Sequence, residues 1–115
     1  MPPKDDLLLL GHMLDTATKI SVRVSGLDRE SFDENEDLRL ALAHLVQVIG
    51  EAARGVSAEG RLRLPSIPWR EITGMRHKIV HDYMDVSFDV LWAVVTQDLP
   101  PLLAELEKAV PPDDE

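Results

Sequence analysis

Three residues of this chain have side chains and a spacing suited to phosphodiester chemistry: Arg76, His81 and Tyr83. Arginine is a permanent cation whose planar donors match phosphate oxygens. Histidine is the side chain that exchanges protons near neutral pH. Together these two residues are sufficient to cleave an RNA phosphodiester without a metal ion, because the adjacent 2′-hydroxyl of RNA supplies the nucleophile. DNA lacks that hydroxyl and would be spared.

Four helical segments are expected to position these residues, because apolar residues recur at helical spacing. The segments cover residues 4–24, 31–55, 69–83 and 87 to the acidic tail. Pro100 and Pro101 must kink or restart the last helix, since proline has no N–H for the helical ladder. The predicted fold class is therefore all-α, an antiparallel four-helix bundle in which residues 1–115 form a single domain.

Local signals mark the ends of these helices. Ser31 and Glu34 have capping-box spacing at the start of the second helix. Residues 56–68 are expected to form the longest connector, and Pro68 can start the third helix. Gly74 lies inside that helix, where glycine costs about 1 kcal/mol relative to alanine. A close approach by another backbone is therefore expected at Gly74.

The spacing within the motif raises a geometric problem. On an ideal helix, Arg76 and His81 would lie about 140° apart, whereas Arg76 and Tyr83 would share a face. A single straight helix would not direct Arg76 and His81 at one phosphate. Either the helix ends near His81, or a two-fold axis brings two copies of the motif into one cleft. Short helices leave a broad apolar surface, so a symmetric homodimer built on the middle helices is predicted.

Composition limits the possible classes of protein. The chain is 44% hydrophobic but only 4% aromatic, and it has no cysteine, which excludes disulfides and thiolate metal sites. No apolar run approaches the roughly 18 residues that span a bilayer. The N-terminus does not resemble a secretory signal. A cytoplasmic protein that does not act at a membrane is expected.

Charge is unevenly distributed along the chain. The formal net charge is −9, but residues 54–83 contain six Lys or Arg against three acids. This pattern predicts an acidic body with one basic face. The alternative is that acids simply solvate the first and last helices.

The stretches IGEAARGVS (49–57) and IPWREITGMRHKIVHDYMDVSFDVLW (67–92) carry a family resemblance. Together with LDTATKI and FDENEDLRLALAHLVQVIGEAA upstream, they resemble the HepT-like toxins of the HEPN superfamily of small helical nucleases. The most specific part is the motif Arg, four residues, His, one residue, Tyr. Here it is formed by Arg76, His81 and Tyr83.

The resemblance implies a dimer with a composite cleft between protomers, and a metal-independent endoribonuclease that needs no cofactor. Arg76 and His81 would be catalytic. The partner implied is a minimal nucleotidyltransferase (MntA-like) antitoxin of a type VII-like toxin–antitoxin system. That enzyme would transfer AMP groups from ATP onto Tyr83 and so silence the toxin.

Three further residues are expected to support the cleft: Glu51, His77 and Asp82. Glu51 would orient a motif residue or cap the cleft. His77 stands where the superfamily often has asparagine, and its protonation would make the charge of the cleft depend on pH.

Other assignments compete with this one. Arg76 could merely pair with Glu51 or Asp82. His77 and His81, four apart, could share a zinc ion with Asp85, although no metal is expected. Trp69 and Trp92 lie on apolar stripes and are expected in the core rather than as stacking platforms for bases.

A rival function of a different class is a non-catalytic helical module that binds a nucleotide or the partner transferase. In that case Arg76 would only grip phosphate. Replacing His81 with alanine separates the two, because only a ribonuclease needs the imidazole.

Overall fold

The computed structural model describes residues 3–82 and 85–111, and for residues 76, 80–82, 85 and 86 it describes the backbone only. Its elements follow the order α1 (Lys4–Val24), α2 (Arg29–Glu34), α3 (Glu36–Arg54), α4 (Ala58–Arg63), α5 (Trp69–Thr73), α6 (Met75–Ile79), β1 (Val80–Asp82), β2 (Asp85–Val86), α7 (Phe88–Ala93), the π-helix η1 (Val94–Asp98) and α8 (Leu99–Ala109).

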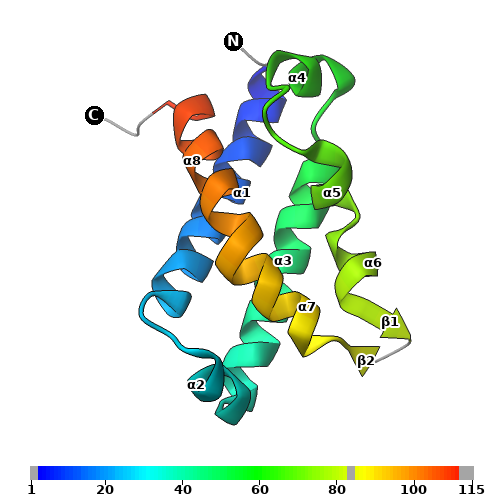
Figure 1. Ribbon diagram of the computed structural model, residues 1–115. Helices are drawn as coiled ribbons and strands as arrows, with labels where there is room; N and C mark the ends of the chain where they lie inside the picture. The colour runs from blue at the N-terminus through cyan, green and yellow to red at the C-terminus, as the bar shows by residue number, and fades with distance from the viewer. Residues whose placement is uncertain (1–2, 83–84, 112–115) are drawn as a thin grey trace.

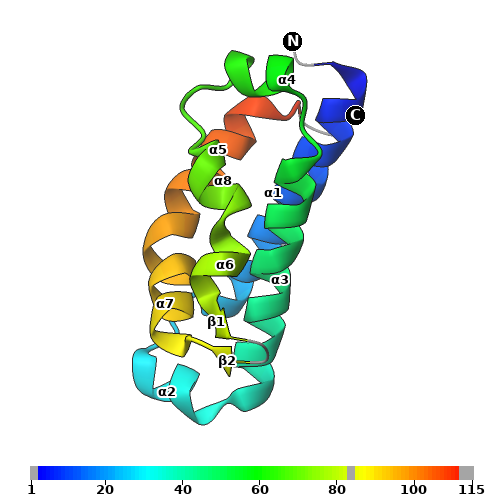
Figure 2. The same ribbon diagram turned by 90° about the vertical axis from the view of Figure 1, so that its right-hand side faces the viewer.

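The architecture is an all-α bundle, so the predicted fold class is confirmed. Helices α1 and α3 run antiparallel side by side, and α7, η1 and α8 form one continuous rod across them (Figure 1). Helices α5 and α6 lie between α3 and that rod, and the short β1–β2 hairpin follows them at one end of the bundle (Figure 2). Dimerisation stays a prediction.

Helix α1 begins and ends at the residues expected from its apolar stripe. Two acids lie in its first turn and Arg23 lies in its last turn. Both placements stabilise the helix, because these charges interact favourably with the helix dipole. Its buried side chains recur with helical periodicity and form a continuous stripe against the core: Asp6, Leu10, Met13, Thr16, Ala17 and Ile20. One member of this stripe is an acid.

The second predicted helix is in fact two helices, and the predicted capping box is wrong. Asp28 caps α2 by accepting from the Ser31 N–H at 2.8 Å, so Ser31 lies inside the helix rather than at its cap. Asn35 then interrupts the helix and caps α3 by accepting from the Leu38 N–H at 3.0 Å. The Asn35 side chain offers the backbone a hydrogen bond in place of those of the continuous helix, so the helix is interrupted at this position.

The connector 56–68 contains an additional helix, α4, which a buried carboxylate holds in place. Asp6 is 3% exposed and accepts from the Ser57 N–H at 2.9 Å and from the Ser57 hydroxyl at 2.6 Å. The Ser57 hydroxyl oxygen in turn accepts from the Gly60 N–H at 3.0 Å and caps α4. An added Cβ at Gly60 would lie 2.2 Å from the Asp6 carboxylate, so this contact requires glycine.

The third predicted helix is shorter than expected and is broken at Gly74. Pro68 forms its N-cap, α5 ends at Thr73, and α6 ends at Ile79 instead of continuing to residue 83. The predicted backbone approach at Gly74 is also wrong, because the nearest atoms to an added Cβ belong to its own segment. The close approach occurs at Gly50 instead, where an added Cβ would lie 3.2 Å from the carbonyl oxygen of Ile72.

The two consecutive prolines restart the last helix. Ser87 caps α7, and the chain then widens into η1, where the Leu99 N–H donates to the carbonyl of Val94, five residues earlier. Pro100 and Pro101 lie in the first turn of α8, where a missing N–H costs least. The wider π-type turn therefore accommodates both prolines without ending the rod.

Both tryptophans are half-buried and pack against the core, as expected. The Trp69 indole N–H donates to the carbonyl of Leu64 at 3.1 Å, and the Trp92 ring lies 4.9 Å from that of Phe32. No helix in the described ranges has both the length and the apolar character needed to cross a bilayer.

The contact between Asp6 and Ser57 predicts a specific pH dependence of stability. Hydrogen bonds from the Ser57 hydroxyl and backbone N–H lower the pKa of Asp6 below its ordinary value of 3.8. A lowered folded-state pKa stabilises the fold above pH 3.8, and this contribution is lost as the pH falls through the lowered value. We expect Asp6→Asn to lower the free energy of unfolding at neutral pH, and the deficit to shrink below about pH 3.8.

Urea unfolding at several pH values measures this effect, with Asp5→Asn as the control, because Asp5 is an exposed acid in the same turn. A deficit of the same size at pH 3 and at neutral pH would show that the ionised carboxylate is not what holds Ser57.

The approach at Gly50 predicts a second difference in stability. Valine at position 50 would push against the Ile72 carbonyl, and overpacking of this kind costs about 1–3 kcal/mol. The matched control is Gly11→Val, since no atom lies within 4 Å of an added Cβ there. Thermal and urea unfolding should show a clear loss for Gly50→Val and little change for Gly11→Val. Equal effects would mean that helix propensity, rather than packing, limits residue 50.

Candidate functional site

The predicted motif is divided between two elements. Arg76 lies in α6, and His81 lies in β1, two residues beyond the end of the helix. Tyr83 lies outside the described residues, as do the side chains of Arg76, His81 and Asp82. The first geometric alternative is therefore the one observed, because the helix ends before His81. The second, a cleft across a two-fold axis, stays a prediction.

The hairpin that carries His81 has an irregular register. Val80 is opposite Val86 and Asp82 is opposite Asp85, so two steps along β1 match one step along β2. His81 is the extra residue. Such bulges bend a strand, re-aim side chains and are frequent beside functional sites. A hydrogen bond of 2.7 Å from the Ser87 N–H to the carbonyl of Ile79 closes the base of the hairpin.

The core fixes the orientation of α6. Met75 and Ile79 are 5% and 0% exposed, and the helix lies between α3 and α7. This burial leaves His77 and Lys78 in solvent. His77 is thus available at the surface beside the motif arginine, as a supporting residue of a cleft must be.

Glu51 lies on the exposed side of α3, and its carboxylate pairs with Arg54 at 3.5 Å. It therefore belongs to the same side of the bundle as α5, since Arg54 also donates to the carbonyl of Thr73 at 3.4 Å. A role for Glu51 in orienting a motif residue stays a prediction.

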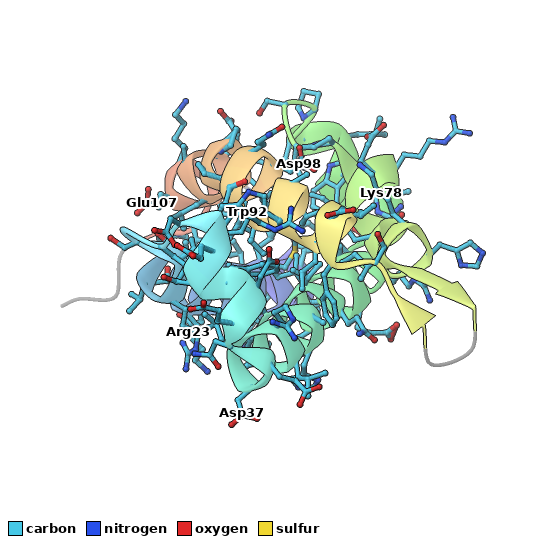
Figure 3. The ribbon with its side chains drawn as sticks, turned by 60° about the horizontal axis from the view of Figure 1, so that its bottom comes forward. Arg23, Asp37, Lys78, Trp92, Asp98 and Glu107 are labelled. Atoms are coloured by element: carbon cyan, nitrogen blue, oxygen red, sulfur yellow. The ribbon has the colours of Figure 1, made fainter. Side chains whose placement is uncertain are left out.

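Beside α6 runs a groove that the sequence did not reveal. It lies between α5–α6 and η1–α8 and encloses about 320 Å³. Its walls are mostly apolar, and its polar side chains are Glu71, Lys78, Gln97 and Asp98. Lys78 and Asp98 face each other at 3.9 Å (Figure 3). Both are about half exposed, so this ion pair orients the two side chains more than it stabilises the fold.

No group of three His, Asp or Glu side chains in the described part of the chain is arranged to hold a metal ion. The zinc alternative depends on His81 and Asp85, whose side chains lie outside that part. It stays a hypothesis.

Two residues that position the site were not identified from the sequence. Gly50 allows α5 to pack closely against α3. The sequence feature that could have indicated this role is the position of Gly50 on the buried stripe of α3, beside Ile49 and Ala53. Asp6 anchors the connector that leads to α5, and its signal was an acid one turn before Leu10 on the apolar stripe of α1.

Comparison with known proteins adds independent information. The profile of one protein family, described as ribonuclease HepT-like, matches residues 13–109. A candidate RNase of Caldanaerobacter subterraneus subsp. tengcongensis is 34% identical over 101 residues, which cover 88% of this chain and 87% of that protein. A candidate RNase of Methanocaldococcus jannaschii is 29% identical over 107 residues, covering 93% of this chain and 98% of the relative.

A third relative, from Thermococcus cleftensis, is named as a candidate ribonuclease HepT and is 35% identical over 79 residues, 69% of this chain and 72% of its own length. Comparison with solved structures gives no match. The family match begins inside α1, ends with α8 and contains the complete motif at residues 76–83. The chain belongs to the HepT-like ribonuclease family.

Proposed function

We propose that this protein is the toxin of a type VII-like toxin–antitoxin system, a metal-independent endoribonuclease whose Arg76 and His81 act in a composite cleft of a homodimer. The observation that carries the proposal is the family match over residues 13–109, which contains the whole motif. The end of α6 at Ile79 supports it, because His81 is released from the helix that carries Arg76.

The chemistry is a transesterification within RNA. The 2′-oxygen forms a bond to phosphorus while the bond from phosphorus to the 5′-oxygen breaks. His81 takes the 2′-hydroxyl proton or protonates the leaving oxygen, and its copy in the partner protomer serves the complementary role. Arg76 stabilises the charge that builds on the equatorial oxygens. The products are a 2′,3′-cyclic phosphate and a 5′-hydroxyl.

Silencing would occur at Tyr83. Its phenolic oxygen attacks the α-phosphate of ATP on the partner nucleotidyltransferase, pyrophosphate leaves, and AMP stays attached to the tyrosine. The added group is bulky and anionic. It would fill the cleft and compete with substrate phosphate for Arg76, since both are anions.

Cleavage of RNA by the unmodified protein in excess chelator tests the catalytic proposal. Mass spectrometry first confirms that Tyr83 carries no AMP. We expect cleavage with cyclic phosphate ends, and a loss of about 10²- to 10⁴-fold in His81→Ala, the usual contribution of a general acid or base. His44→Ala is the matched control, since His44 is an exposed histidine on α3.

Three outcomes would contradict the proposal. Full cleavage by His81→Ala would remove the imidazole from the mechanism. Folded dimer that binds RNA or nucleotide without cleaving it would identify the chain as a binding module. Activity that disappears with chelator and returns with zinc would favour the metal alternative instead.

The silencing step has a separate test. Incubation with the nucleotidyltransferase and ATP should abolish cleavage by the wild-type protein but not by Tyr83→Phe, which lacks the acceptor oxygen. Mass spectrometry should find AMP only on the wild type. If AMP is added to another residue, or if Tyr83→Phe is silenced equally, Tyr83 is not the regulated position.

A further inference from the structure

The cations of the basic segment are not equivalent in the structure. Between residues 54 and 79 there are six Lys or Arg residues and two acids, in a chain whose net charge is −9. Each of the five whose side chains are described can be sorted by what it already binds. The sorting separates cations held by close contacts or surrounded by carboxylates from cations that are only loosely held.

Arg61 holds the fold. Its guanidinium donates to the carbonyls of Ala53 and Arg54 at 3.1 and 3.4 Å, and its Cζ lies 5.7 Å from the centre of the Trp69 ring. It satisfies carbonyls at the C-terminal end of α3 and covers an aromatic face. If this side chain moved away to bind a ligand, the two carbonyls would lose their donor and the face of the Trp69 ring would be exposed.

Arg63 is also engaged, since it pairs with Glu59 at 2.9 Å. Lys78 is not held closely, because Asp98 lies 3.9 Å away. Two carboxylates, those of Glu71 and Asp98, nevertheless line the groove together with Lys78. An approaching phosphate would meet these carboxylates there.

Arg54 is held only loosely. Its side chain is 56% exposed, and its two contacts, to Glu51 at 3.5 Å and to the Thr73 carbonyl at 3.4 Å, are both longer than a typical hydrogen bond. Arg70 is exposed, and no acid in the described ranges forms an ion pair with it.

Tertiary packing brings together the two helices that carry these arginines. The close approach of Gly50 to Ile72 sets α5 against α3. The Arg54 guanidinium then reaches the carbonyl of Thr73, the last residue of the short helix that also carries Arg70. The next helix, α6, carries Arg76. Two available guanidinium groups thus stand on the elements next to the motif.

We propose that Arg54 and Arg70 bind the backbone phosphates of single-stranded RNA beside the cleavage site, whereas Arg61, Arg63 and Lys78 do not. The proposal rests on the proposed function for the class of ligand. Its physical basis is that phosphate contacts position a nucleic acid without reading its sequence. Arg54 and Arg70 can make such contacts without breaking a close structural interaction.

RNA binding by the His81→Ala protein tests this directly, because the RNA stays intact. We expect Arg54→Gln/Arg70→Gln to bind a single-stranded oligoribonucleotide about tenfold more weakly at low salt. The slope of log K against log salt should fall in magnitude by about 1.4, the value for two lost phosphate contacts on a single strand. Arg54→Lys/Arg70→Lys should keep most of the affinity, since a lysine still neutralises phosphate.

The matched control is Arg23→Gln/Arg63→Gln, which makes the same change in net charge. Arg23 lies on α1, far from Lys78 (Figure 3), and Arg63 is paired with Glu59. If both double variants lose RNA affinity equally, the affinity depends only on net charge, and the proposal would be wrong. No weakening in either would also overturn it.

A cleavage assay separates this proposal from the proposed function. In the active protein, the Arg54→Gln/Arg70→Gln variant should have a higher KM for long RNA with kcat unchanged, and unaltered cleavage of a dinucleotide too short to reach the two arginines. If the wild type cleaves no RNA, the proposed function fails, but the binding measurement on His81→Ala still decides whether Arg54 and Arg70 hold RNA.

Discussion

The contact on which the rest of the site depends is the approach of the Ile72 carbonyl to Gly50. No side chain stands between the two backbones there, so α5 lies against the C-terminal part of α3. The segments that follow α5 depend on this placement. It brings Thr73 within hydrogen-bond distance of the Arg54 guanidinium. It also places α6 so that Met75 and Ile79 are buried in the core. A single glycine therefore sets the position of the segment that carries the motif.

The motif region departs from regular helix for identifiable reasons. The chain leaves α6 at Ile79 because the next residues pair with 85 and 86, and the Ser87 N–H donates to the Ile79 carbonyl. Opposite, the rod passes through a π-type turn just before Pro100 and Pro101. π-Type turns are frequent at functional sites. The groove described above lies between α5–α6 and this rod.

Sequence reasoning succeeded where the determining signal was local and strong. The bounds of α1 follow from an uninterrupted apolar stripe with acids at its start and a cation at its end. Reasoning failed where a side chain competed with the helix backbone. The predicted second helix runs through Asn35, because Ser31 and Glu34 have capping-box spacing, yet the Asn35 side chain caps α3 and divides that helix. The end of α6 was missed because the pairing of residues 80–82 with the short strand β2, which no apolar pattern indicates, decides it.

The amino-acid sequence by itself determined the all-α class, the content and spacing of the motif, and the family to which the chain belongs, because helical periodicity and motif spacing are properties of neighbouring residues. Only the tertiary structure decided which glycine admits a neighbouring backbone and which of the basic residues are already neutralised. The carbonyl that approaches Gly50 is 22 residues away, and the acid that faces Lys78 is 20 residues away. Such pairings depend on how whole helices pack, and no local pattern encodes them.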